Sequence, residues 1–459
     1  MFTPPYLQVL DQVDPKLLGM FKQFWRRPLS EYVLSMFKQS DTPLSEEGKR
    51  SKQKLYHAIR LHLERSGKDC TFDELDFDQF PAIQTGPHCQ LLLDPQTFWA
   101  WGLTWHGANM AGKSRFLVYN CSTVKLETSA KRGPGWMPVE GHPVKIFELR
   151  REVLAATSTV CLQSVHGFSA DELSNVLRNS GIDKRLRADI FDTLSKAAGS
   201  SAADLITNAN TMFFDRWTPH SSPQPIFIDD RFVARLIALH VVDDQSLIFR
   251  LLFDPVVREK FIWIQRDHKS APYGNMLRDS TSFFWTTRNQ RVRRMVLKDH
   301  HLVEEGNNAN SIALCPSEVY NGLAKGLLLP GLFLTFAALS ILPHIRALGG
   351  TWQIGYYPLF HKIIADVVRE VLGFDDVNEQ LAVPPLHGFG MDLVDRSYDP
   401  IEAMTLMRSK PFPLSKAVEA MGLTTFSEAS RELSTIATNV GWIDLHKRTG
   451  SSHVGEVLQ

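Results

Sequence analysis

The order of strand, helix and strand between residues 80 and 121 constrains the fold of this chain more than any other feature. A short apolar strand is expected from Phe80 to Gln84, and a helix from Pro95 to about Met110 with Asp94 as its N-cap. A second strand is expected over residues 116–121, which are rich in strand-forming side chains. Two strands joined through a helix form a βαβ unit, which predicts a parallel sheet.

The rest of the chain divides into segments of different character around this unit. We expect an α/β fold with a Rossmann-like, mostly parallel sheet that is split by a helical insertion and flanked by helical N- and C-terminal segments. Its parts are an N-terminal helical segment (1–72), the first part of the α/β core (73–150), the helical insertion (151–212), the second part of the core (213–375) and a C-terminal helical segment (376–459).

Apolar runs in the second part of the core predict further strands. These are strands at 225–230, 247–253 and 283–288, a hairpin with a polar turn over 291–303, and a last strand at 344–350 that feeds a helix over 357–372. The uncharged run Gly326–Leu342 is shorter than the about 20 residues that a membrane-spanning helix needs, and Pro330 interrupts it. We therefore expect a helix buried between other layers there.

The charge balance and the cysteines restrict the partners and the compartment. The chain has 50 Lys and Arg residues against 50 Asp and Glu residues, so it lacks the basic excess with which nucleic-acid-binding proteins neutralise phosphates. With 44% hydrophobic and 22% charged residues, it has the composition of a globular protein. The five cysteines include no CxxC pair, and the first residues lack a secretory pattern, which predicts a cytoplasmic protein with no membrane partner. Association into a homo-oligomer stays open.

One segment satisfies the phosphate-loop pattern G-x-x-x-x-G-K-[ST]. It is Gly107-Ala-Asn-Met-Ala-Gly112-Lys113-Ser114, and Asp229 or Asp230 at a later strand end would supply the carboxylate on the magnesium side. A phosphate loop follows a strand and opens a helix, whereas this segment follows a predicted helix and precedes a strand. The favoured interpretation is a helix end closed by Gly112. A nucleotide-binding site that uses Gly112, Lys113, Ser114 and Asp229 is the alternative.

Another group of candidates follows the first predicted strand, at Thr85-Gly86-Pro87-His88-Cys89-Gln90. Ligands of open α/β sheets bind outside the carboxyl ends of the strands. We expect Thr85 and Gly86 to contact substrate there, since a glycine lets a ligand approach the backbone closely. His88 is the acid/base candidate because imidazole titrates near neutral pH. For Cys89, a small buried side chain is favoured over a nucleophile.

Two further segments carry candidate binding residues. Gly349 and Gly350 end the last predicted strand, and Gln353 and Tyr356 follow at the start of a helix. We expect the glycines to form a pocket wall or a tight turn, and Gln353 and Tyr356 to act in the active site by orienting substrate. Lys131 and Arg132 lie in a Gly/Pro-rich loop that binds an anionic group or forms a solvated surface. No residues recur at the spacing of metal ligands, so no metal site is expected.

Three short segments share their order and spacing over residues 80–360 with one known family. Thr85-Gly86, followed by Leu91 and Pro95, is similar to a Thr-Gly-Gln-Gln-Ala-Gly-Leu-x-x-Gly-Pro stretch. Residues 282–291 resemble an aromatic-then-charged hairpin, and residues 342–357 resemble a Pro…Gly-Gly/Gly-Pro-x-Glu-Ile-x-Tyr-Trp segment. These features belong to the cysteine-adding enzymes (cysteine ligases) of bacillithiol biosynthesis, and the resemblance implies a Rossmann-like core with a helical connector.

The chain departs from that family at several of these positions. Pro87-His88 stand where the family has paired glutamines, Asp94-Pro95 where it has Gly-Pro, and Gln353 where it has glutamate. The long coiled coil of the family has no heptad counterpart here. The resemblance therefore implies the fold more than the substrate.

These observations lead to three hypotheses about function. The leading one is a ligase- or transferase-like enzyme of small-molecule biosynthesis, which the resemblance implies joins an amino acid or another small amine or thiol to a small anionic metabolite. The same core is suited to secondary metabolism. The alternatives are a P-loop nucleotide-binding hydrolase and a non-catalytic interaction protein with a degenerate pocket. ATP is the one cofactor that these hypotheses raise, and the expected partner is a small molecule.

Overall fold

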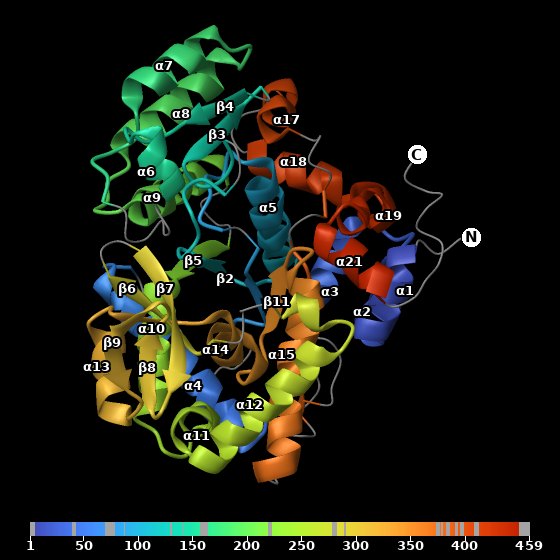
Figure 1. Ribbon diagram of the computed structural model, residues 1–459. Helices are drawn as coiled ribbons and strands as arrows, with labels where there is room; N and C mark the ends of the chain where they lie inside the picture. The colour runs from blue at the N-terminus through green and yellow to red at the C-terminus, as the bar shows by residue number, and fades with distance from the viewer. Residues whose placement is uncertain are drawn as a thin grey trace.

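The computed structural model shows a mixed α/β protein in which two larger sheets are surrounded by helices (Figure 1). The structure describes residues 5–38, 43–68, 79–86, 88–128, 131–140, 142–156, 164–218, 223–277, 282–288, 291–372, 377, 380–381, 386–390, 393–394, 399–407 and 413–448. Pro87, which belongs to the first group of candidates, lies outside the described residues.

A parallel sheet forms the centre of the fold. Its strands stand in the order β12-β11-β1-β2-β5, and the pairings between them are parallel. They are β1 (Ala82–Gln84), β2 (Arg115–Asn120), β5 (Gln224–Asp229), β11 (Arg346–Gly349) and β12 (His387–Phe389). In the middle of the sheet, Ile83 pairs with Leu117 on one side and with Ala347 on the other. The expected α/β fold with a parallel sheet is confirmed.

The helix of the predicted βαβ unit is α5 (Pro95–Met110), which connects β1 to β2. Asp94 caps it, because its side chain accepts a hydrogen bond of 3.1 Å from the backbone N–H of Thr97. Trp101 and Trp105 of this helix are buried, and α5 also packs against α3 (Leu29–Met36) and α18 (Pro413–Gly422). A helix that is covered on both sides has no polar face, which explains why its sequence is apolar all round.

The chain between β2 and β5 forms a separate layer at the upper left of Figure 1. It begins with a hairpin of β3 (Trp136–Val139) and β4 (His142–Lys145), followed by α6 (Arg151–Ala156), α7 (Ala170–Asn179), α8 (Lys184–Lys196) and α9 (Ala202–Trp217). The helices confirm the expected insertion between two parts of the sheet. The sequence does not predict the hairpin, because its strands are short and Pro138 lies opposite Pro143 in it.

A second sheet, which is antiparallel, has the strand order β10-β6-β7-β8-β9. Its strands are β6 (Phe284–Arg288), β7 (Arg291–Lys298), β8 (His301–Glu304), β9 (Asn307–Ala313) and β10 (Leu328–Pro330). Strands β7 and β8 confirm the predicted hairpin, and Asp299 and His300 make its turn with left-handed φ angles of 44° and 62°. This sheet lies at the lower left of Figure 1.

Residues 247–253 form the helix α11 (Leu247–Phe253) instead of the predicted strand. Leu247, Ile248, Leu251 and Leu252 are its buried side chains, and this spacing of three and four residues is that of one helix face. A segment of seven residues, six of them apolar, does not distinguish a buried strand from a buried helix by itself. The helix α12 (Pro255–Ser270) follows directly, with Asp254 as its N-cap.

The uncharged run 326–342 also differs from its prediction, because it is buried but is not one helix. It contains β10, then α14 (Leu332–Phe336) and a π-helical turn (Ala337–Ile341). Pro330 has no N–H for a helical hydrogen bond, so the chain pairs with β6 at this point, and the helix begins after Gly331.

Helices from both ends of the chain lie side by side on the right of Figure 1. The N-terminal ones are α1 (Pro5–Val13), α2 (Pro15–Phe24) and α3; the C-terminal ones are α17 (Pro400–Met407), α18, α19 (Phe426–Ala429), α20 (Ser434–Ala437) and α21 (Val440–Arg448). Helix α4 (Glu46–Arg65) lies apart from them and contacts α10 (Asp230–Val241). Helix α1 contacts α21, and α3 contacts α18 and α19. Both expected helical ends are confirmed. Within the described residues, no helix combines the length and the apolar character that crossing a bilayer requires.

The helices that follow β1 and β11 cover opposite faces of the parallel sheet. These two strands are neighbours, but α5 leads from β1 to β2 on one side, whereas α15 (Gln353–Val367) leads from β11 toward β12 on the other. Crossovers between parallel strands are right-handed, which places the two helices on different faces. Ligands of open α/β sheets bind at such a switch point, outside the carboxyl ends of the strands.

Candidate functional site

The carboxyl ends of the parallel strands bring several candidate residues to one edge of the sheet. Thr85 follows β1, Cys121 follows β2, Asp230 follows β5 and Gly350 follows β11. Because the strands are parallel, all these ends point the same way. The edge has two parts: a pocket at β2 and β5, and a cluster at the switch point between β1 and β11.

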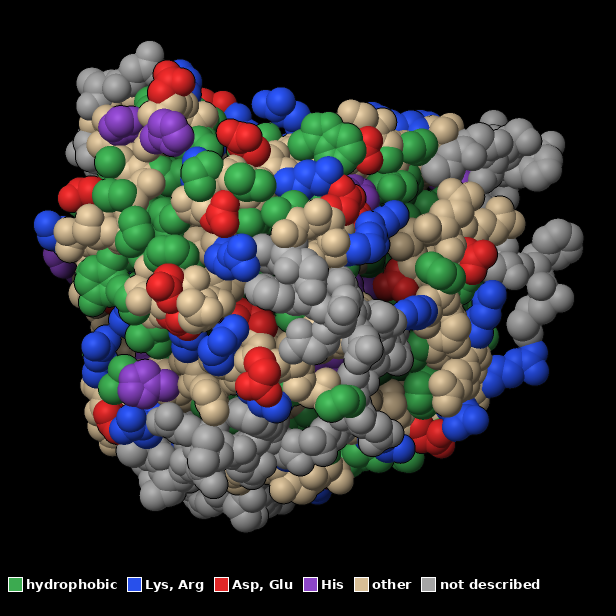
Figure 2. Space-filling view, turned by 90° about the horizontal axis from the view of Figure 1, so that it is seen from below, with side chains coloured by type: hydrophobic (Ala, Val, Ile, Leu, Met, Phe, Trp, Pro, Cys, Tyr) green, Lys and Arg blue, Asp and Glu red, His purple; other side chains and the backbone are tan. Residues whose placement is uncertain are grey.

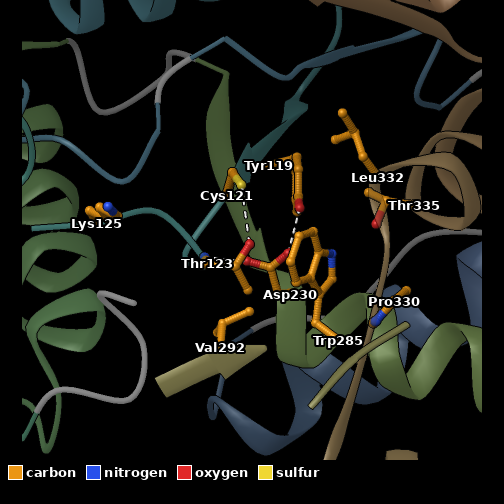
Figure 3. Close-up of a pocket in the computed structure, with 10 residues that line it drawn as sticks. All are labelled: Tyr119, Cys121, Thr123, Lys125, Asp230, Trp285, Val292, Pro330, Leu332 and Thr335. Atoms are coloured by element: carbon orange, nitrogen blue, oxygen red, sulfur yellow. Dashed lines mark hydrogen bonds between the residues drawn. The ribbon is translucent and has the colours of Figure 1, made fainter. Parts of the chain in front are cut away.

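A pocket of about 300 Å³ opens at the ends of β2 and β5 (Figure 3). This is the size of a small-molecule site. One wall carries the side chains that come from the parallel sheet and the residues directly after it: Tyr119, Cys121, Thr123 and Asp230. The second sheet and α14 form the opposite wall, with Trp285, Val292, Pro330, Leu332 and Thr335. Lys125 is exposed and lies well away from Asp230 in the close-up.

Asp230 is the centre of a hydrogen-bond cluster in this pocket. It is the first residue of α10 (Asp230–Val241) and is 2% exposed. Its Oδ1 accepts a hydrogen bond of 2.6 Å from the hydroxyl of Tyr119. Its Oδ2 accepts from the N–H and the hydroxyl of Ser122 at 2.6 and 2.9 Å, and from the N–H of Thr123 at 2.9 Å. The carboxyl group therefore holds the loop after β2 against the first turn of α10.

Burial dominates the protonation of this cluster. It raises the pKa of Asp230 above its ordinary value, against the hydrogen bond from Tyr119, and the negative charge of Asp229 adds to the rise. Burial and the charge of Asp230 raise the pKa of the Cys121 thiol to about 12, and they also raise the pKa of Tyr119. Cys121 therefore presents a thiol at neutral pH, not the thiolate that a nucleophile needs.

Three of the predicted residues meet in the switch-point cluster, which consists of Thr85, Gly349 and Gln353. The Thr85 hydroxyl lies 2.5 Å from Oε1 of Gln353 and 3.0 Å from the carbonyl oxygen of Leu348. A Cβ on Gly349 would lie 2.0 Å from the same Oε1, so only glycine permits this approach. Gln353 is 3% exposed, and its Nε2 has no hydrogen-bond partner among the described residues. The cluster thus contains a buried donor that is left unsatisfied.

The remaining predicted residues of this edge lie around the cluster. Gly86 is buried, and its N–H donates a hydrogen bond of 2.8 Å to Oε1 of Gln84. Gly350 is buried in the turn between β11 and α15. Tyr356 lies one turn into α15, where burial, followed by the charge of Cys121, raises the pKa of its hydroxyl. Its ring packs against Phe336 and Phe360, and Tyr356 is not among the described residues that line the pocket.

Other predicted residues lie elsewhere. His88, Lys131 and Arg132 are exposed, and none of them is among the described residues that line the pocket. The backbone N–H of Lys131 donates to Oε1 of Glu127 at 3.4 Å, which folds the loop on itself. Lys125, earlier in the same loop, is the basic residue that lines the pocket. Cys89 is fully buried, in agreement with the favoured interpretation.

The structure does not bring the residues of the phosphate-loop alternative together, because they lie at opposite ends of the sheet. Gly112, with a left-handed φ of 66°, ends the α5 segment, and Lys113 and Ser114 lead into the amino end of β2. Asp229 lies opposite Asn120 at the carboxyl end, and a six-residue strand spans about 20 Å. Asp229 instead accepts a hydrogen bond of 2.9 Å from the N–H of Phe232, as the cap of α10.

Sequence reasoning missed most of the residues that line the pocket. It considered Asp230 only as a magnesium-side carboxylate, and it did not single out Tyr119, Trp285 or Thr335 as site residues. The rule that ligands bind at carboxyl strand ends, applied to β2 and β5, would have selected Tyr119 and Asp230. Trp285 and Thr335 come from segments far along the chain, and no local pattern marks them as pocket residues.

A second cavity, of about 430 Å³, lies at the other end of α10. Its lining residues are Val241, Val242, Asp244, Phe249, Pro316, Ser317, Tyr320 and Asn321. Since α10 has twelve residues, the two cavities are separated by about 18 Å of helix. Asp244 in this lining is exposed, so the cavity lacks the buried charge of the first pocket. Within the described part of the chain, no three His, Cys, Asp or Glu side chains are placed to hold a metal ion.

Comparison with protein-family models and with curated proteins finds no match for this chain. The fold and the pocket describe the chain as an α/β protein with a pocket of small-molecule size at the carboxyl edge of its parallel sheet.

Proposed function

We propose that this chain is a ligase- or transferase-like enzyme of small-molecule biosynthesis that joins a small amine or thiol to a small anionic metabolite. The observation that carries the proposal is the pocket at the ends of β2 and β5, next to the switch-point cluster. Two sites at one sheet edge suit a reaction between two small molecules, because catalysis of a bimolecular step requires that both be held together.

The switch-point cluster suits the anionic substrate. Helix α15 begins at Gln353, so the positive end of its dipole lies at the carboxyl edge of the sheet and attracts anions. The N–H groups of Ile354, Gly355 and Tyr356 already donate to backbone carbonyls, so the attraction comes from the dipole and not from these groups. Gln353 adds the side-chain Nε2 that lacks a partner among the described residues.

The mixture of basic and acidic side chains on the surface favours a small anion over a polyanion as the ligand. On the lower face of the molecule, Lys and Arg side chains alternate with Asp and Glu side chains over the described residues (Figure 2). This fits the equal numbers of basic and acidic residues in the chain. His88, the acid/base candidate, is exposed and does not line the pocket, so the proposal gives it no step in the reaction.

A product search tests the proposal. The protein is incubated with pooled amino acids, other amines and thiols together with pooled carboxylic and phosphorylated metabolites, with and without MgATP. We expect mass spectrometry to detect a product that contains one molecule from each pool. The variant Val292→Trp, which places a large ring in the pocket, abolishes this product, because Val292 lines the cavity.

Val256→Trp is the matched control. Val256 lies on α12 and is 66% exposed, so the same substitution there leaves the product unchanged. Absence of any joined product in the wild-type reactions, or equal product from Val292→Trp, would contradict the proposed function.

A further inference from the structure

Asp230 stands out because its charge has no ionic partner among the described residues. Its neighbour Asp229 forms an ion pair of 2.6 Å with Arg231, and Arg231 also pairs with Asp204 at 2.7 Å. Asp230 instead accepts hydrogen bonds from neutral donors only, namely Tyr119, Ser122 and Thr123. Buried charges in proteins are normally paired. A buried carboxyl group that forms no ion pair with a described residue is therefore available to a cation that enters the pocket.

The residues of the wall that faces Asp230 indicate which kind of cation the pocket would bind. The indole of Trp285 lines the same pocket as the Asp230 carboxyl group and overlaps it in the view of Figure 3. Val292 and Pro330 also line this pocket. An indole ring attracts cations through its π face, and it also packs against flat apolar groups. A hydrated metal ion gains nothing from these apolar neighbours, because such an ion requires oxygen ligands on several sides. An organic ammonium group suits both walls at once.

We propose that the pocket between Asp230 and Trp285 is an amine subsite, which binds the protonated amine of a ligand whose apolar part lies against Trp285. The ammonium group donates to Oδ1 of Asp230, which accepts a single hydrogen bond in the structure, from Tyr119. This inference rests on the proposed function, in that it assigns the amine of the two substrates to this pocket.

The other titratable groups around Asp230 do not provide a competing cation. Tyr119 and Cys121 approach from β2, and Asp229 approaches from β5; none of the three carries a positive charge. Strands β6, β7 and β10 and helix α14 contribute Trp285, Val292, Pro330, Leu332 and Thr335, which do not titrate near neutral pH. Lys125 lies at the rim and away from the carboxyl group in Figure 3.

Calorimetric titration with three probes of similar shape tests the amine subsite. The probes are phenethylamine, phenethyl alcohol and hydrocinnamate, which end in an ammonium, a hydroxyl and a carboxylate group. We expect the amine to bind at least about tenfold more tightly than the alcohol, because a charge-assisted hydrogen bond is stronger than a neutral one. Hydrocinnamate binds most weakly. In Asp230→Asn the preference for the amine over the alcohol disappears.

Trp285→Leu is a second test of the amine subsite, because it removes the indole ring without changing any charge. It weakens phenethylamine binding roughly three- to thirtyfold, the range expected for loss of a cation–π contact. Trp263→Leu is the matched control: Trp263 is 57% exposed on α12, and its loss leaves binding unchanged. If melting curves show that Asp230→Asn is unfolded, two other results test the amine subsite. They are the order of affinity of the three probes for the wild type and the loss of phenethylamine affinity in Trp285→Leu.

Several outcomes would overturn the amine subsite. They are equal affinity for amine and alcohol in the wild type, no binding of any probe at millimolar concentration, or a preference for the amine that survives in folded Asp230→Asn. The inference and the proposed function fail separately. Amine binding without a joined product removes the ligase- or transferase-like assignment and leaves the subsite, whereas a joined product without amine preference does the reverse.

Discussion

The hydroxyl of Tyr119 donates a hydrogen bond of 2.6 Å to Oδ1 of Asp230, which lies 111 positions later in the chain. The two residues meet because β2 and β5 pair in parallel, with Asn120 opposite Asp229. The whole helical insertion lies between them in sequence and leaves this pairing intact. The bond therefore links the two strand ends that form one wall of the pocket.

Removal of the Tyr119 hydroxyl tests whether Asp230 is charged in the folded protein. We expect Tyr119→Phe to lower the free energy of unfolding at pH 7 by about 1.5–3 kcal/mol, the cost of losing a hydrogen bond to a charged group. Tyr357→Phe is the control, since the Tyr357 hydroxyl forms a hydrogen bond of 2.6 Å with the neutral Ser340 hydroxyl. Its loss costs about 0.5–1.5 kcal/mol. Urea unfolding measures both, and equal costs would mean that Asp230 is uncharged in the folded protein.

The contact between Gly349 and Gln353 predicts a coupled pair of substitutions. Gly349→Ala places a Cβ 2.0 Å from Oε1 and 2.2 Å from Cδ of Gln353, so the side chain is displaced and the free energy of unfolding falls by about 1–3 kcal/mol. In a Gln353→Ala background the obstacle is gone, and the same substitution costs less than about 1 kcal/mol.

Gly19→Ala is the control for this pair. Gly19 lies on the exposed side of α2, where a Cβ meets nothing within 4 Å, and there alanine raises helix stability by about 0.5–1 kcal/mol. Additive effects of Gly349→Ala and Gln353→Ala would show that the two residues do not touch in solution.

Buried histidines predict loss of stability in acid. Burial, with the charges of Lys52 and Arg346, lowers the pKa of His344 from 6.5 to about 4, and burial lowers that of His240 to about 3. Below pH 6.5 the unfolded chain takes up protons on these rings while the folded chain does not. The free energy of unfolding therefore falls as the pH is lowered from about 6.5 to about 4.

His344→Asn tests this assignment, because asparagine is uncharged throughout and tolerates the left-handed φ of 56° at this position. We expect the slope of unfolding free energy against pH to decrease by up to about 1.4 kcal/mol per pH unit between pH 4 and 6.5. His300→Asn is the control, since His300 is exposed and also left-handed. An unchanged slope in His344→Asn would show that His344 titrates normally.

The position of Lys113 gives a test of the phosphate-loop alternative. Lys113 lies at the amino end of β2, at the edge opposite the pocket and the switch-point cluster. We expect Lys113→Ala to leave the affinity for MgATP, measured by titration with a fluorescent ATP analogue, unchanged within twofold. A tenfold weakening would restore the loop as a nucleotide site.

Elements with a local signature were predictable from the sequence. The α5 helix carries Asp94 as its cap, and β2 is a run of strand-forming residues, so both lie close to the expected positions. Segment 247–253 was not predictable, because its apolar run fits a strand and a buried helix equally until its neighbours are known. The helix α15 begins at Gln353 instead of 357, which brings Gln353 into its first turn.

The residues of the candidate site also fall into a group that the sequence predicts and a group that it does not. Thr85, Gly349 and Gln353 were predictable because glycines and polar residues after a strand mark the carboxyl edge of a sheet. Asp230 is next to Asp229, and the sequence does not tell which of the two enters the pocket. The resemblance to the bacillithiol-pathway family and the activity that it implies both stay predictions.

The sequence alone determined a parallel α/β sheet with a helical insertion and helical ends, because periodicity, caps and strand-forming runs act over short distances. The tertiary structure decided which strand ends share a pocket. Trp285 and Thr335 reach Asp230 only because the second sheet and α14 pack against the ends of β2 and β5. Packing between distant segments depends on the shape and burial of whole surfaces, and no local pattern of residues encodes it.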